Sequence, residues 1–344
     1  MSKPSRFSVC SRPDDARTIS QPAWWRWWLP VLLLTGIFWL SLFSGSAVPV
    51  APLEALKALA PHPPANLAQA LVFNLRLPRS LVAMLLGASL ATAGSLLQTL
   101  TRNPLASPSL LGINAGASLA MVIASALNPA WLAGYSISLL AAAGGAISWG
   151  MVMLMGTAQI DRSRLILAGV TVSAFCAALT KAIVLLSEDH AFGIMHWLAG
   201  GVAHVRWQEF WRLFPVTAVI APLAWLLARR LNLLQLSDDS ARTLGVNLPR
   251  MRLTIVVMVA LLVGSCVSVA GPLAFIGLLV PHIARLWIGH DLRKMLPVAM
   301  IFGALFLLLA DLLSRAIGPG EMPAGVILAL TGAPFFIWLV RKRI

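Results

Sequence analysis

The chain has 344 residues, of which 59% are hydrophobic and only 11% are charged. Soluble domains carry about a quarter charged residues, so this composition excludes an ordinary water-soluble globular protein. The 26 Lys and Arg residues outnumber the 12 Asp and Glu residues, which gives a formal net charge of +14. Because these cations cluster between apolar runs, we interpret them as a membrane topology signal and expect no nucleic-acid partner.

At the N-terminus, residues 1–26 are predicted to form a cytoplasmic tail, and residues 27–344 a transmembrane domain. The apolar run from Leu29 to Ser44 has no short hydrophobic region followed by a small-residue cleavage site. We therefore interpret this run as a retained first span and not as a secretory signal.

The rest of the chain contains further apolar runs, each about as long as the roughly 20 residues that a helix needs to cross a bilayer. The runs are continuously apolar and lack the alternation of a transmembrane barrel. We therefore predict an all-α polytopic bundle of about ten transmembrane helices. The expected spans are residues 27–48, 78–100, 106–127, 131–156, 164–187, 207–228, 252–271, 273–289, 296–316 and 322–340.

The basic residues are divided unequally between the two sides that these spans define. With the N-terminus inside, nineteen Lys and Arg residues fall on the inner side and seven on the outer side. This positive-inside bias places both termini in the cytoplasm, and the inner cations favour anionic membrane lipid.

Small residues recur on one face of the second and third predicted spans. Ala83, Gly87, Ala91 and Ser95 follow a four-residue spacing in the second, and a GxxxG pattern begins at Gly112 in the third. Such faces let membrane helices approach closely. We expect close helix packing there; a helix lining a translocation path is the alternative interpretation.

The sequence predicts no catalytic residue, no metal site and no cofactor on this chain. A P-loop requires a Gly-Lys dipeptide, and none of the five lysines follows a glycine. The cysteines and histidines have no metal-ligand spacing.

Two charged residues lie within predicted spans. Asp311 stands four residues before Arg315, so an intrahelical ion pair and a proton relay are both open interpretations. Lys181 lies near enough to the outer end of the fifth predicted span to reach the interface. An ion-coupled carrier would need one of these groups to titrate.

The inner loop over 231–252 contains the start and stop signals of a short, capped helix. Ser237 can cap it, Asp238 and Asp239 suit its first turn, and Gly245 predicts its end. Pro249 suits the first turn of the next helix. We interpret the short helix as a docking element; a solvated connector is the alternative.

Three arginines lie on the otherwise cation-poor outer side: Arg76, Arg79 and Arg315. An acidic extracytoplasmic partner would pair with them through charge-assisted hydrogen bonds. Binding of phospholipid headgroups, together with the Asp311 pair, explains them equally well from the pattern alone.

From about Trp28 onward the chain resembles the permeases of type II ABC importers for iron chelates, haem and cobalamin. The motifs that carry the resemblance are RLPRSLVAMLLGASLATAGSLLQTLTRNPLASPSLLGINAGA (76–117), LSDDSARTLGV (236–246), VAGPLAFIGLLVPHIARL (269–286), LLADLLSR (308–315) and PAGVILALTGAPFFIWL (323–339).

The resemblance implies a permease subunit in the bacterial inner membrane that translocates an iron(III) chelate, with ferric dicitrate as the expected cargo. Another siderophore, haem or cobalamin is the alternative cargo. The implied partners are a second permease, expected to be a paralogue in a heterodimer, a periplasmic binding protein, and two ATPase subunits that hold ATP and Mg.

The resemblance also assigns roles to residues of this sequence. It places Arg76, Arg79 and Arg315 where such permeases meet the binding protein. It places the coupling helix that meets the ATPase at Ser237, Asp238, Asp239, Ala241, Leu244 and Gly245. The second and fifth spans would border the pathway near Gln98, Asn114 and Lys181.

Overall fold

The computed structural model describes residues 24–44, 50–60, 66–127, 135–155, 162–186, 191–236, 238–317 and 321–343, and the predicted N-terminal tail lies almost entirely outside them. The described residues form helices and connecting segments without strands. Within the described residues, seven helices are long and apolar enough to cross a membrane, and three shorter apolar helices accompany them. These match the ten predicted spans: α1 (Trp25–Phe43), α4 (Leu77–Thr101), α5 (Ile113–Leu127), α6 (Tyr135–Met155), α7 (Arg162–Leu186), α9 (Trp207–Leu226), α12 (Leu248–Ala270), α13 (Ile276–Ile288), α14 (Leu292–Ala316) and α15 (Ala324–Arg343).

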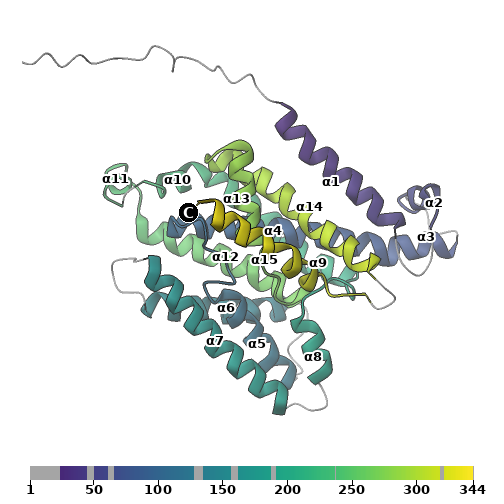
Figure 1. The fold of residues 1–344 in the computed structure, drawn as a ribbon, viewed down its shortest axis with the longest axis horizontal. Coiled ribbons are helices and arrows are strands. Elements are labelled where there is room, and N and C mark those ends of the chain that lie inside the picture. The colour runs from purple at the N-terminus through teal and green to yellow at the C-terminus, as the bar shows by residue number, and fades with distance from the viewer. Residues whose placement is uncertain are drawn as a thin grey trace, which may run out of the picture.

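Shorter elements lie between the spans. They are α2 (Pro52–Lys57), α3 (Leu67–Leu71), a π-helical turn (Val72–Arg76) that leads into α4, α8 (Ala191–Leu198), α10 (Ala228–Leu233) and α11 (Asp238–Thr243). Figure 1 shows α10 and α11 at one end of the bundle and α2 and α3 at the opposite end. The predicted inner loop and the predicted outer segments are therefore at opposite ends of the molecule.

Helix α4 is the centre of the bundle. It packs against α14, α12, α13 and α9. Within the most apolar 18 residues of the continuous helical segment Leu67–Thr101, which contains α4, 78% of the residues are buried. The corresponding buried share in the peripheral helix α1 is 17%. Helices α5, α6 and α7 pack together, with α5 and α6 against α12, on another side of the bundle (Figure 1).

Glycine pairs let the central helices touch backbone to backbone. A Cβ atom on Gly87 of α4 would lie 2.1 Å from the carbonyl oxygen of Gly303 in α14, and one on Gly94 would lie 1.9 Å from that of Gly277 in α13. These separations exclude a side chain at either position. The predicted close packing on the second span is confirmed at Gly87, and a similar approach joins Gly116 to α6.

Among the side chains that α7 exposes, six are large and apolar: Leu167, Val170, Phe175, Leu179, Leu185 and Leu186. Large apolar side chains exposed in this number are unfavourable in water and favourable against lipid or another membrane protein. The fold thus has the surface of a membrane protein as well as its helix lengths.

Candidate functional site

The end of the bundle that is predicted to face outward holds a buried ionic network centred on Asp311 of α14. The Asp311 carboxylate is fully buried, and its Oδ1 accepts hydrogen bonds from Arg79 Nε at 2.9 Å and Arg79 Nη2 at 2.8 Å. Its Oδ2 accepts a hydrogen bond from Arg315 Nη2, one helical turn away. A buried carboxylate is costly unless it is paired, and two guanidinium groups meet that need. The predicted Asp311–Arg315 ion pair is confirmed, and Arg79 is a further partner.

Arg79 also contacts the surface through Glu321, which stands outside the helices just before α15. Arg79 Nη1 donates to Glu321 Oε2 at 2.7 Å, and the Glu321 side chain is 34% exposed. With His196 and His204, the charged groups Arg79, Asp311 and Glu321 line a recess of about 270 Å³. One guanidinium therefore joins a buried carboxylate to a carboxylate at the edge of this recess.

The other two outer arginines hold the end of α1. Arg76 Nη1 donates to the carbonyl oxygens of Leu42 at 3.1 Å and Phe43 at 2.9 Å, and Arg315 Nη1 donates to that of Ser41 at 3.2 Å. The last carbonyls of a helix lack intrahelical partners, so these cations satisfy the C-terminus of α1. All three outer arginines are buried and engaged within the chain, and their docking to an acidic partner stays a prediction.

Two of the three predicted pathway residues share one groove. Asn114 of α5 and Lys181 of α7 line a groove of about 410 Å³ that also includes Pro272 and Ala274. Asn114 Nδ2 donates to Ser109 Oγ at 2.9 Å, and the buried Asn114 Oδ1 has no hydrogen-bond partner among the described residues. A buried acceptor of this kind is available to water or to a ligand.

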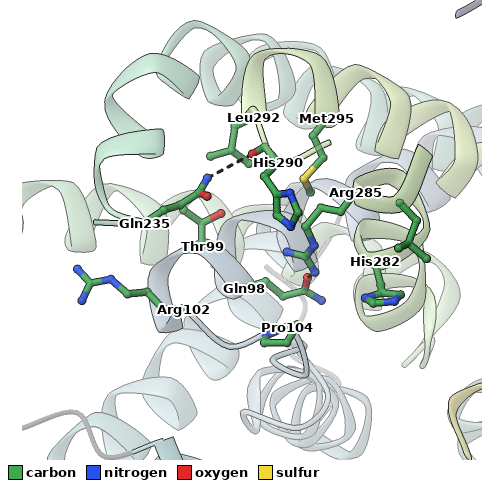
Figure 2. Close-up of a pocket in the computed structure, with 11 residues that line it drawn as sticks. Gln98, Thr99, Arg102, Pro104, Gln235, His282, Arg285, His290, Leu292 and Met295 are labelled. Atoms are coloured by element: carbon green, nitrogen blue, oxygen red, sulfur yellow. Dashed lines mark hydrogen bonds between the residues drawn. The ribbon is translucent and has the colours of Figure 1, made fainter. Parts of the chain in front are cut away.

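Gln98, the third predicted pathway residue, lies in a different pocket of about 390 Å³ at the end of α4 (Figure 2). Gln98 Nε2 donates to the Gly277 and Leu278 carbonyls at 3.4 and 3.2 Å, and its Oε1 accepts from Arg285 Nη2. In Figure 2 the Arg285 guanidinium lies directly beside the Gln98 amide, near His290. Gln98 therefore does not line the groove that holds Asn114 and Lys181. Its side chain instead links α4 to α13 through hydrogen bonds.

The predicted coupling stretch forms the short helix that its start and stop signals predicted. Helix α11 begins with Asp238 and Asp239, and Gly245 follows it with φ of +79°, a left-handed conformation that suits glycine. Ala241 is buried and Leu244 is exposed. Ser237, the predicted cap, lies outside the described residues.

The start of the next helix is also as predicted. Asn247 caps α12 by accepting a hydrogen bond from the Arg250 amide at 3.1 Å. Pro249 lies in the first turn of the same helix. The C-terminal side of α11 is thus well defined, with a glycine stop at Gly245 followed by the capped helix α12.

Asp238 ties α11 to two spanning helices. Its Oδ1 accepts a hydrogen bond from Arg102 Nη2 at 2.6 Å, and its Oδ2 accepts one from Arg252 Nη2 at 2.7 Å. Burial acts to raise the pKa of Asp238, but the hydrogen bonds and charges of Arg102 and Arg252 outweigh it and hold the pKa below its ordinary value. The carboxylate therefore stays ionised and bridges α11 to the end of α4 and to α12.

Three partners in these two networks were not predicted from the sequence: Arg102, Arg252 and Glu321. Arg252 lies 14 residues after Asp238, and an acidic residue followed by a basic one in the same loop is a usable signal. Arg102 and Glu321 are far in sequence from the groups they contact, so local patterns give no signal for them. Among the described residues, no group of His, Cys, Asp or Glu is arranged to hold a metal ion.

Known proteins with similar sequences identify the family to which this helical bundle belongs. The model of the FecCD transport family matches residues 32–342. The chain is 61% identical to the Fe(3+) dicitrate transport system permease protein FecC of Escherichia coli (strain K12), over 92% of this chain and 97% of that protein. It is 40% identical to the Fe(3+)-citrate import system permease protein YfmD of Bacillus subtilis (strain 168), over 80% and 82% of the two chains. It is 41% identical to the vitamin B12 import system permease protein BtuC of Salmonella paratyphi A (strain ATCC 9150 / SARB42), over 79% and 83%.

Solved structures agree with this assignment. An inward-facing metal-chelate type ABC transporter matches with a TM-score of 0.77 and 28% identity, over 92% of this chain and 98% of that one. PsaBC from Streptococcus pneumoniae in complex with Fab matches with a TM-score of 0.57 and 19% identity, which shows likeness of fold alone. The curated relatives are transport permeases and not enzymes. The chain belongs to the FecCD transport family and is a membrane-spanning permease of the ABC importer class.

Proposed function

We propose that this permease moves an iron(III) citrate chelate inward across the bacterial inner membrane. The observation that supports this choice of cargo is the 61% identity, over nearly the whole chain, to a protein named as an Fe(3+) dicitrate permease. Identity to a permease named for vitamin B12 is 41% over a smaller share of the chain. Cobalamin is therefore the second candidate cargo.

We further propose that the permease works as a heterodimer with a paralogous second permease, with two ATPase subunits inside and a binding protein outside, and with both of its own termini in the cytoplasm. The large apolar side chains that α7 exposes support a contact with the second permease, because the same helix contributes Lys181 to the groove. ATP and its Mg ion belong to the ATPase subunits in this proposal.

The two ionic networks support docking at both ends of the bundle. Helix α11 carries a bridge from Asp238 to two spanning helices, so a partner that moves α11 also pulls on α4 and α12. At the other end, Arg79 lies in a recess where an acidic side chain of the binding protein can approach it. Arg76 and Arg315 lie beside it and complete the proposed docking face.

The groove between α5 and α7 supports the choice of an anionic cargo. Lys181 is exposed there, and the remaining polar lining consists of neutral amide and hydroxyl groups such as Asn114 and Ser118. A single cation attracts an anionic chelate, and neutral groups do not hold it tightly. The proposed path therefore passes the cargo without a high-affinity site on this chain.

The cargo is tested by transport competition in proteoliposomes that contain the complete importer. Uptake of radioactive iron supplied with excess citrate should proceed, and a large excess of cobalamin should leave it unchanged. Uptake of labelled cobalamin in place of iron would overturn the cargo assignment while leaving the importer class intact.

A further inference from the structure

The recess at the outer end contains a carboxylate in the position where an acidic partner would bind. Arg79 is held by two carboxylates of very different exposure: the Asp311 side chain is fully buried, and the Glu321 side chain is 34% exposed. The buried partner is bound through two N–H groups, at 2.9 and 2.8 Å, whereas Glu321 accepts one hydrogen bond at 2.7 Å. The two contacts are therefore unequal in both burial and number.

The geometry of the guanidinium limits where a further carboxylate can bind. Asp311 occupies the edge formed by Nε and Nη2. A carboxylate that approaches from the recess can pair with two N–H groups only at the edge formed by Nη1 and Nη2. Glu321 already accepts a hydrogen bond from Nη1, one of the two nitrogens of that edge. An incoming carboxylate that binds both nitrogens therefore competes with Glu321 for Nη1.

Glu321 can leave at lower cost than Asp311. Its side chain is 34% exposed, so it regains hydration when the pair opens, whereas a fully buried carboxylate would be left unpaired away from water. Glu321 also stands outside the helices, between α14 and α15, so its movement breaks no helical hydrogen bond. Asp311 is fully buried and lies within helix α14, and it is also bound to Arg315. It therefore gains no hydration on leaving and cannot move without disturbing the helix.

We propose that Glu321 occupies the place on Arg79 that a carboxylate side chain of the docking binding protein takes, so that docking exchanges one carboxylate for another. This inference rests on the docking face proposed above. Its consequence is that Glu321 competes with the partner: it keeps Arg79 paired in the free permease and lowers the affinity of docking.

Competition is measured with the complete permease–ATPase complex in nanodiscs and the fluorescently labelled binding protein of the same import system. In the Glu321→Gln variant the competitor loses its charge, so the dissociation constant should fall roughly two- to fivefold, the range of a partly exposed ion pair. In the Arg79→Lys variant, which keeps the charge but loses the planar fork, docking should weaken.

Glu209→Gln is the matched control, because it removes one negative charge from the same predicted face, where Glu209 accepts a hydrogen bond from the Arg206 amide at 2.9 Å. It should leave the affinity unchanged. Glu321→Asp keeps the charge on a shorter side chain and should give a smaller gain than Glu321→Gln. This variant separates loss of contact with Arg79 from loss of charge, and size-exclusion chromatography confirms assembly of each complex.

The outcomes separate the two proposals. If Arg79→Lys weakens docking but Glu321→Gln does not strengthen it, or if Glu209→Gln strengthens it as much, the exchange is wrong and the docking face stands. If Arg79→Lys, Arg76→Gln and Arg315→Lys all leave the affinity unchanged, the docking face itself is wrong.

Discussion

The Nη2 atom of Arg102 lies 2.6 Å from Oδ1 of Asp238 and joins the end of the central helix α4 to the first residue of α11. Arg102 adopts a left-handed backbone conformation with φ of +49° at the C-terminus of α4, and its Nε donates to the Leu234 carbonyl at 2.6 Å. The Arg102 side chain thus bonds both the residue that follows α10, Leu234, and the first residue of α11, Asp238. A displacement of α11 must either break this bond or move the end of α4.

Replacing Asp238 by Asn should therefore weaken the link between ATP hydrolysis and transport. Each ion pair is partly exposed and contributes about 1 kcal/mol or less, so the fold should persist while α11 loosens. We expect transport per ATP hydrolysed to fall several-fold in proteoliposomes. Asp239→Asn is the comparison on the same helix, because it removes a charge from a side chain that is 95% exposed and leaves the bridge to α4 and α12 intact. Equal effects of the two substitutions would contradict a specific role for Asp238.

The same bridge predicts a pH dependence of the inner loop. The pKa of Asp238 is lower in the folded state than its ordinary value, so its contribution to stability is complete above the ordinary value of about 3.9. That contribution is lost as the pH falls through the lower, folded-state pKa. A spin label at position 242, in a chain whose Cys10 is replaced by Ser, should keep constant mobility from pH 8 to about pH 5 and become more mobile only below about pH 4. A change between pH 8 and 5 would show that another group controls the loop.

Replacing Asp311 by Asn should destabilise the permease. Removing one partner of a buried ion pair costs about 3–5 kcal/mol, because the remaining charges lose their compensation, and here two arginines are affected. We expect a lower melting temperature and a lower yield of assembled complex, with ATP-driven uptake retained in those complexes that assemble. A stable complex that hydrolyses ATP without uptake would instead favour a proton relay at Asp311.

Contact between α4 and α14 should not tolerate a side chain at Gly87. A Cβ atom there would lie 2.1 Å from the backbone oxygen of Gly303, and backbone cannot move aside easily. Gly87→Ala should cost about 1–3 kcal/mol, the usual range for overpacking, measured as a lower melting temperature in detergent. Gly150→Ala in α6 is the control, because nothing lies within 4 Å of the added atom. A Gly87→Ala variant as stable as this control would mean that the two helices are further apart.

The spanning helices were predictable because the bilayer imposes a length and a polarity that a single sequence displays. All ten predicted spans contain a helix, and the boundary differences are largest at the third, where α5 begins at Ile113 and the expected span began at 106. The turn over 102–112 interrupts that run, with Gly112 in a left-handed conformation. Hydropathy averages over such a turn and does not register it.

The ionic networks were only partly predictable. Asp311 and Arg315 are one helical turn apart, so their spacing predicts their contact. Arg79 contacts Asp311 across 232 positions, and this pairing depends on how α4 and α14 pack, which no local pattern contains. For the same reason the sequence placed the outer arginines on the outer side without showing that the fold buries them and leaves Glu321 partly at the surface.

In the proposed function, this chain transports its cargo only together with an ATPase and a binding protein. The most direct measurement is iron uptake from ferric citrate into proteoliposomes assembled with the full importer, and with each component omitted in turn. We predict uptake only when both permeases, the ATPase, the binding protein and ATP are all present. Uptake by this permease in the absence of the ATPase and the binding protein would contradict the account.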